Sequence, residues 1–156
     1  LEKNILENIQ CTFVGNGPLK KKFSNKIRKY NFIKLVNFKS RRELIKIYSQ
    51  HNILLFPSKY DGWGVVPMEA MSSKMALIIS KNCGIVEYLN NKKNAFIVEP
   101  NSKDISKAIR YYFYNPSKIN IHGENNLKLI EKSLMNSKNS SKIFFSIINK
   151  LSSTKK

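Results

Sequence analysis

Blocks of apolar residues alternate along the chain with amphipathic stretches, and this pattern predicts short strands separated by helices. Continuous apolar runs rich in β-branched residues are typical of strands covered on both faces. Apolar runs of this kind lie at 33–38, 52–57, 75–80 and 95–98, and residues 9–16 read as a short strand that runs into a glycine turn. Helical periodicity, with apolar positions three or four residues apart, follows them at 19–30, 40–50, 68–73, 84–89 and 104–114. Two further helices are predicted at roughly 124–135 and 139–151, after a break at Pro116.

The alternation of strand and helix predicts an α/β domain, with a Rossmann-like parallel sheet covered by helices. Ser40 and Glu43 have the spacing of a capping box, which marks the start of one helix. The domain is expected to span 1–151, followed by a frayed tail at 152–156. In such sheets, ligands bind beyond the carboxyl ends of the strands. The loops expected there are 15–18, 37–40, 57–67 and 80–87.

The composition is that of a folded and strongly basic protein. Lys and Arg number 28 against 10 Asp and Glu, for a net charge of +18, and 42% of residues are hydrophobic. This charge favours anionic partners such as nucleic acid, acidic lipid head groups or phosphorylated small molecules. The abundance of Lys and Asn also fits an AT-rich genome, so the charge alone is weak evidence of function. No apolar run reaches the ~20 residues of a membrane span, no secretory signal is seen, and a cytoplasmic location is expected.

Two glycine-containing turns are candidates for binding chemistry. Gly15 and Gly17 follow the first predicted strand and precede a helix, where backbone N–H groups favour an anion. The stronger candidate is Asp61-Gly62-Trp63-Gly64, which is followed within the next helix by Glu69. Acidic side chains beside such a turn accept strong hydrogen bonds from sugar or ribose hydroxyls. The alternatives are a plain strand–helix turn, an Asx turn at Asp61 and an exposed helical Glu69.

Residues 54–71 resemble the donor-binding signature of family 4 glycosyltransferases, retaining enzymes of the GT-B fold. The shared pattern is a strand, Pro-Ser, an acid, Gly-aromatic-Gly, and a second acid eight positions after the first. The neighbouring segments resemble the family in the same order at 13–18, 36–38, 40–44, 83–87, 94–100 and 104–109. The resemblance implies the C-terminal, nucleotide-sugar-binding half of such an enzyme.

The resemblance also implies roles for individual residues, with Asp61 and Glu69 as the catalytic-site acids. Glu69 would hold the ribose hydroxyls and Asp61 the donor sugar. The remaining donor-binding residues implied are Gly15, Gly17, Val36, Asn37, Phe38, Trp63, Gly64 and Val65. Trp63 would stack on the sugar or anchor the loop. The family uses no metal, and His51 and His122 stand apart from any metal-ligand cluster.

Three departures from the family pattern carry their own expectations. Lys74-Met75-Ala76 stands where the family has Gly-x-Pro, which predicts a changed helix end. The family's first strand, with its basic diphosphate clamp, has no counterpart, and residues 1–8 resemble only the end of the helix after it. A split fragment that needs a partner chain would leave an exposed edge beside the strand at 9–16. Lys59 and Lys81 are candidates to replace the clamp, with solvated side chains as the favoured alternative, and Lys20–Lys22 is expected on a solvated face.

The function implied is transfer of a sugar from an NDP-sugar to an acceptor hydroxyl with retention, in synthesis of a cell-surface polysaccharide or lipid-linked glycan. The implied partners are the nucleotide sugar, a glycan or lipid-linked acceptor, an N-terminal acceptor domain or partner chain, and an anionic membrane surface. Neither a metal nor another cofactor is expected. Two alternatives remain: an inactive or split donor domain that needs a partner chain, and a basic nucleic-acid-binding module, which would bind with a steep salt dependence.

Overall fold

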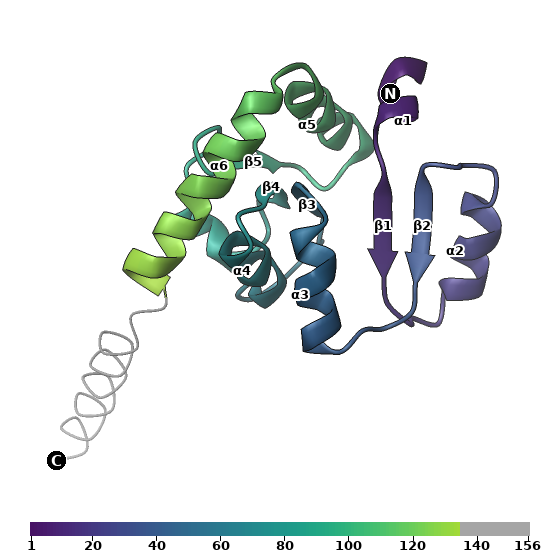
Figure 1. The fold of residues 1–156 in the computed structure, drawn as a ribbon, viewed down its shortest axis with the longest axis horizontal. Coiled ribbons are helices and arrows are strands. Elements are labelled where there is room, and N and C mark those ends of the chain that lie inside the picture. Colours follow the sequence, from purple (N-terminus) through teal and green to yellow (C-terminus); the bar gives the residue numbers. More distant parts are fainter. Residues whose placement is uncertain (135–156) are drawn as a thin grey trace, which may run out of the picture.

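The computed structural model describes residues 1–134, an alternation of helices and short strands (Figure 1). In chain order the elements are α1 (Lys3–Asn8), β1 (Cys11–Val14), α2 (Lys20–Ile27), β2 (Ile33–Val36), α3 (Arg41–Ser49), β3 (Ile53–Phe56), α4 (Val65–Ser72), β4 (Ala76–Ser80), the 3-10 helix η1 (Gly84–Tyr88), β5 (Ala95–Val98), α5 (Ser102–Tyr114), α6 (Pro116–Leu129) and the π-helical turn η2 (Ile130–Leu134). The helix predicted at 139–151 and the tail at 152–156 lie outside the described residues.

All pairings between these strands are parallel, as predicted, but the strands form two sheets. β1 pairs with β2 in one, and β3, β4 and β5 follow one another in the second. The predicted class, parallel sheet covered by helices, is confirmed, and the sheet is divided in two because β1 and β3 do not pair. Among the described strands β1 pairs with β2 alone, so its other edge carries no strand. Figure 1 shows β1, β2 and α2 to one side of the β3–β5 sheet, with α3 in the connection between them.

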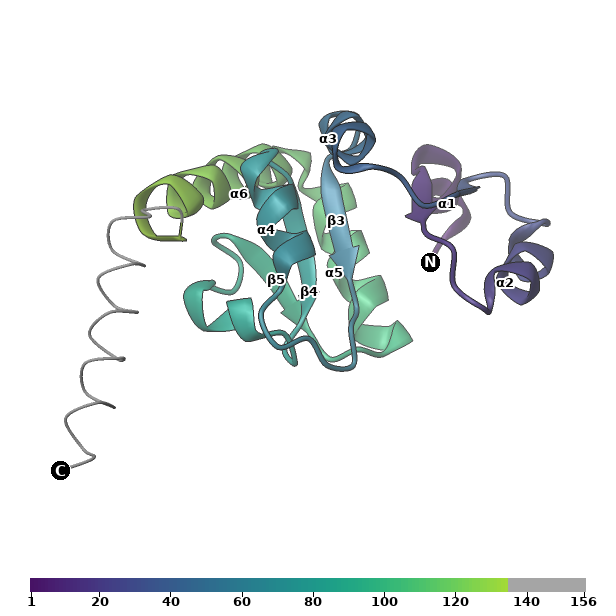
Figure 2. The same cartoon turned by 90° about the horizontal axis from the view of Figure 1, so that it is seen from below.

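The β3–β5 sheet is buried on both faces, which explains its uninterrupted apolar sequence. Successive side chains of a strand point to opposite faces. Ala76 and Ile78 therefore pack with α5, whereas Leu77 and Ile79 belong to the core on the side of α4 and α6. Figures 1 and 2 show the three strands enclosed between α4 and α5. Burial on both faces therefore fixes the sheet from which the loop after β3, with Asp61, Trp63 and Gly64, extends.

Two helices begin earlier than the sequence pattern predicted. α4 begins at Val65 rather than at 68, because Gly64 takes the left-handed conformation and serves as its N-cap. α6 begins at Pro116 rather than near 124. Proline suits the first turn of a helix, where its missing N–H has no partner to lose. Pro116 thus separates α5 from α6 and also starts α6.

The end of α4 has a regular geometry despite its lysine. The N–H of Lys74 donates to Met71 O at 3.1 Å and that of Met75 to Ala70 O at 3.0 Å, which is a Schellman motif. Lys74 takes the left-handed conformation, φ 58°, that glycine usually supplies. The expected change of the helix end is therefore not seen. Within residues 1–134, no helix combines the length and apolar composition needed to cross a bilayer.

Candidate functional site

The predicted site residues lie in or beside the loops at the carboxyl ends of the parallel strands, and Val65 and Glu69 lie in α4; they form two groups. The first group joins the glycine turn after β1 to the loop after β2. The N–H of Gly15 donates to Val36 O at 3.0 Å. Lys20 Nζ donates to Asn16 Oδ1 at 3.1 Å and also to Asn37 Oδ1. The structure thus brings Gly15 together with Val36 and Asn37, and adds a lysine.

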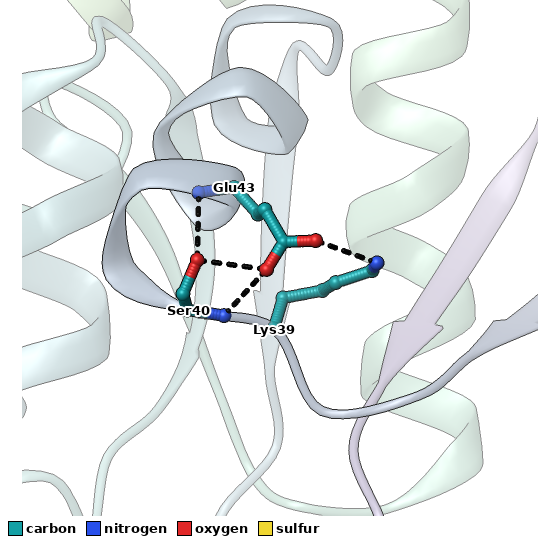
Figure 3. Close-up of polar contacts among 3 residues, drawn as sticks. All are labelled: Lys39, Ser40 and Glu43. Atoms are coloured by element: carbon teal, nitrogen blue, oxygen red, sulfur yellow. Dashed lines mark hydrogen bonds and ion pairs between the residues drawn. The ribbon is translucent and has the colours of Figure 1, made fainter.

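A network at the start of α3 fixes the loop after β2 (Figure 3). Glu43 Oε2 accepts from the N–H of Ser40 at 2.9 Å and from its Oγ at 2.7 Å, while Glu43 N–H donates to Ser40 Oγ at 3.4 Å. This confirms the predicted capping box. Lys39 Nζ approaches Glu43 Oε1 at 2.8 Å. Hydrogen bonds from Lys39 and Ser40 lower the pKa of Glu43 to about 2. The neighbouring Phe38 is 72% exposed and free to contact a ligand.

The second group is built around Asp61 in the loop after β3. Its N–H donates to Asn82 O at 3.2 Å, and Gly84 N–H donates to Asp61 O at 3.0 Å. Asp61 Oδ1 accepts from the N–H of Trp63 at 3.1 Å. The Asx turn considered from the sequence is therefore present. Oδ2 makes no hydrogen bond to any residue in 1–134, so the carboxylate keeps an acceptor for a ligand.

Gly64 and Gly84 allow the loop after β3 to pack closely against the loop after β4. A Cβ on Gly84 would lie 2.3 Å from Gly62 O, and one on Gly64 would lie 2.9 Å from Cys83 Sγ. Gly64 also has φ 99°, which side-chain-bearing residues rarely adopt. Trp63 is 45% exposed and packs edge-on against Tyr88 at 5.7 Å. The close approach of the two loops thus fixes the amino end of α4, where unpaired N–H groups favour an anion.

Glu69 lies in α4, four residues after Val65 and so on the same helix face. Its Oε2 accepts a hydrogen bond from the hydroxyl of Tyr48, on α3, at 3.1 Å. Tyr48 is buried, and burial together with the adjacent Glu69 carboxylate raises the pKa of its hydroxyl to about 12. Glu69 itself is half-buried. The exposed helical Glu69 considered as an alternative is therefore not what the structure shows.

A cavity of about 500 Å³ separates β1 from β3. Phe38 is the predicted site residue that lines it. Its walls at the carboxyl ends also include Val14, Tyr48, Pro57 and Val66, which adjoin or contact the other predicted residues. The other predicted site residues are not part of its wall.

The histidines of the described chain serve structural contacts. His51 Nδ1 lies 2.7 Å from Ile47 O and its Nε2 lies 2.9 Å from Thr12 Oγ1. Because the carbonyl only accepts, Nδ1 carries the proton and the hydroxyl donates to Nε2. His122 is buried against Tyr112, with 2.8 Å between Nδ1 and the phenol oxygen. Across residues 1–134, no three His, Cys, Asp or Glu side chains gather to hold a metal ion. The metal-free site stays a prediction.

Sequence reasoning missed two residues of the site. The sequence placed Tyr48 only within the helix predicted at 40–50, and its link to Glu69 joins residues 21 apart in the chain. Lys20 was expected on a solvated face, yet it bridges the two loops of the first group. Lys81, a candidate for the clamp, pairs instead with Glu99 at 2.6 Å. The sequence signal that could have identified Lys20 as a site residue is its position about one helical turn after the glycine turn.

Fold and site together define a Rossmann-like α/β domain with its candidate ligand site at the carboxyl ends of the strands. Over residues 1–132 the sequence matches the family described as "Glycosyl transferases group 1", and the chain belongs to this family. This confirms the family expected from the sequence.

Two curated relatives illustrate the similarity. The chain is 28% identical to the uncharacterized glycosyltransferase MJ1178 of Methanocaldococcus jannaschii, over 76% of this chain and 35% of that protein. It is 29% identical to the lipopolysaccharide core biosynthesis mannosyltransferase LpcC of Rhizobium leguminosarum, over 54% of this chain and 24% of that protein. The chain thus spans about a third or less of the relatives it matches.

Solved structures confirm the GT-B type of fold. Anabaena HepE in complex with UDP-glucose superposes with a TM-score of 0.71 at 17% identity, over 83% of this chain and 40% of that one. The C-terminal domain of the group 1 glycosyl transferase LpcC from Francisella tularensis gives a TM-score of 0.62 at 16% identity, over 84% of this chain and 90% of that domain. The chain therefore shares the fold of a domain that is C-terminal in its own protein.

Proposed function

We propose that this chain is the donor-binding domain of a retaining glycosyltransferase, which moves a sugar from an NDP-sugar to an acceptor hydroxyl. The observation that carries the proposal is the pair of carboxylates flanking the amino end of α4, with Asp61 before the helix and Glu69 inside it. Within residues 1–134, Oδ2 of Asp61 accepts no hydrogen bond, and the carboxylate of Glu69 is oriented by the hydroxyl of Tyr48. Paired hydroxyl groups on ribose and sugar are suitable donors to these acceptors.

The geometry supports a role for each group of residues. Glu69 accepts hydrogen bonds from the ribose hydroxyls and Asp61 from the donor sugar. The N–H groups at Gly64 and Val65 face the sugar and diphosphate, beside Trp63. The glycine turn at Gly15 and Gly17 borders the diphosphate from the other side, with the Lys20 ammonium near it, and the loop from Val36 through Asn37 to Phe38 borders the base. The proposed catalytic contribution is to position the donor and stabilise the leaving diphosphate without a metal.

The wider setting of the reaction follows from the relatives. One of them is named for lipopolysaccharide core synthesis and a neighbour is solved with UDP-glucose. A cell-surface polysaccharide or lipid-linked glycan is therefore the proposed product, made by a cytoplasmic protein at the inner face of the membrane. The charge of +18 favours such an anionic surface, at about 1 kcal/mol for each nearby Lys or Arg.

The test is a thermal-unfolding screen against UDP-, GDP-, ADP- and TDP-sugars, with Mg²⁺ and with EDTA. A ligand at 100 times its dissociation constant stabilises the folded state by about 2.7 kcal/mol. One base class should raise the midpoint equally under both conditions. Glu69→Gln should abolish the shift, whereas Glu131→Gln, an exposed glutamate on η2 far along the chain, should retain it. A shift that needs Mg²⁺ would overturn the metal-free site, and a shift retained by Glu69→Gln would overturn its assignment.

A further inference from the structure

The positive charge of the chain is concentrated in the segment from β1 to α3. Residues 11–49 contain 11 Lys and Arg residues and a single acid, Glu43, which is already paired with Lys39. Residues 51–134 contain the same number of Lys and Arg but seven Asp and Glu. Three of the four arginines of the chain also lie between residues 11 and 49. A codon bias toward Lys would not deplete one segment of acids, so it does not explain this asymmetry.

The side of α2 that faces away from the β1–β2 sheet carries only basic and neutral side chains. The helix packs on the sheet through Phe23, whose ring meets that of Phe13 edge-on at 4.7 Å. The outer face of α2, together with the turn after it, consists of the exposed residues Lys21, Lys22, Asn25, Lys26, Arg28 and Lys29. None of the ion pairs among residues 1–134 involves these side chains. Their charges are therefore available to an anionic partner.

Exposed apolar side chains flank this basic face at both ends. Leu19, which lies one turn before Lys22 and on the same side of the helix, is 69% exposed. Tyr30, just after the helix, is 40% exposed, and the Lys29 ammonium lies 5.1 Å from the centre of its ring. Lysines beside exposed leucine and aromatic side chains are typical of helices that lie in the interfacial layer of a membrane. The phosphate backbone of a nucleic acid would match the lysines but offers no apolar layer for Leu19.

The place of α2 in the fold leaves its outer face accessible and close to the candidate site. Figures 1 and 2 both show α2 at the end of the described chain opposite α6. The helix begins three residues after Gly17, and its first residue, Lys20, reaches Asn37 in the loop after β2. Contact of α2 with a flat surface would therefore bring the first group of site residues close to that surface.

We propose that the outer face of α2 docks on the anionic surface of a membrane, with its lysines at the lipid phosphates and Leu19 in the interfacial layer. Each Lys or Arg close to an anionic bilayer strengthens binding about fivefold. Salt screens this contribution but not the apolar contribution of Leu19. Docking in this way presents the site to an acceptor carried by the same membrane. The proposal rests on the proposed function for this setting, whereas its test needs no nucleotide sugar.

Vesicle flotation of the 156-residue chain tests the proposal, with vesicles of phosphatidylcholine alone or mixed with phosphatidylglycerol. The chain should bind only the vesicles that contain phosphatidylglycerol, and more weakly as salt is raised. The combined variant Lys21→Gln, Lys22→Gln and Lys26→Gln should lower the partition coefficient roughly a hundredfold. Absence of binding by the parent chain to the phosphatidylglycerol vesicles would overturn the proposal.

A matched variant removes the same charge from other helices. Lys103, Lys107 and Lys128 are exposed on α5 and α6, and their combined replacement by glutamine should change vesicle binding little. Equal losses in the two triple variants would show that net charge alone drives binding, and would overturn a defined docking face. Both variants should keep the parent's unfolding midpoint and its shift with the nucleotide sugar. A parent chain that binds vesicles but no nucleotide sugar would contradict the proposed function and leave the docking face standing.

Leu19 distinguishes a membrane from a nucleic acid as the partner. Leu19→Ser should lower vesicle binding about tenfold, because the leucine side chain no longer enters the apolar layer. Ile121→Ser, at another exposed aliphatic position, on α6, is the control and should bind as the parent does. Unchanged vesicle binding by Leu19→Ser would overturn the proposal. If the α2 lysine variant then also lost binding to duplex DNA, the partner of this face would be a nucleic acid.

Discussion

The hydroxyl of Tyr48 donates a hydrogen bond to Oε2 of Glu69 across 3.1 Å, and this bond joins α3 to α4 beside the candidate site. Each helix follows a different strand of a different sheet. Tyr48 is buried and its phenol stays protonated at neutral pH, since its pKa is raised to about 12. Tyr48 is therefore a positioning residue that acts through Glu69.

Tyr48→Phe should weaken donor binding and leave the fold intact. A hydrogen bond to a charged group contributes about 1.5–3 kcal/mol, so we expect roughly a tenfold or greater rise in the dissociation constant. Titration calorimetry with the nucleotide sugar found in the thermal screen measures the change. Tyr114→Phe, on the exposed end of α5, is the matched control and should bind as the parent does. If Tyr48 acts through Glu69, Tyr48→Phe should have no further effect in a Glu69→Gln background.

Gly84→Ala should destabilise the domain by about 2 kcal/mol or more, because its Cβ would lie 2.3 Å from Gly62 O. Separation of the two loops would also displace Asp61, so donor affinity should fall with stability. Urea unfolding and calorimetry measure the two effects. Gly62→Ala is the control, since nothing lies within 4 Å of a Cβ at that position. Equal stability of the two variants would contradict the interlocking of these loops.

Lys74→Gly should stabilise the domain by about 1 kcal/mol, because a left-handed conformation costs a side-chain-bearing residue about that much. The substitution also removes the Lys74–Glu124 ion pair at 2.9 Å, but such exposed pairs contribute little. Lys74→Ala loses the ion pair and keeps the strained backbone, so it should be no more stable than the parent. Urea denaturation distinguishes the two variants, and a gain from alanine would show that backbone strain is not the cause.

Acidification should release the network at the start of α3. The pKa of Glu43 is lowered to about 2, against about 4.3 in an unfolded chain. A lowered pKa means that this carboxylate stabilises the fold above pH 4.3, and that its contribution is lost as the pH falls toward 2. Glu43→Gln should reduce the loss of stability in this window, as measured by urea unfolding at a series of pH values. Ser40→Ala should cost about 1 kcal/mol at neutral pH through the lost N-cap.

Local sequence signals determined most of the individual elements. The strand at 95–98 occurs where predicted, and the capping box at Ser40 places α3 within one residue. These features depend on neighbours in the chain: alternation of apolar residues, a serine followed by a glutamate, a glycine before a helix. The signature loop with Asp61 and Glu69 was identified in the same way, because its residues are close together in the sequence.

The tertiary structure decided the relationships between distant segments. The sheet is divided between β1 and β3, and no periodicity within a strand reports what lies at its edge. The pairing of Tyr48 with Glu69 depends on how helices that follow different sheets meet, and that of Lys20 with Asn37 on how the segments after β1 and β2 meet. The start of α4 at Val65 depends on the contact of Gly64 with Cys83 in the next loop. Local pattern specifies which element forms, whereas only packing between elements specifies which side chains of different elements face each other.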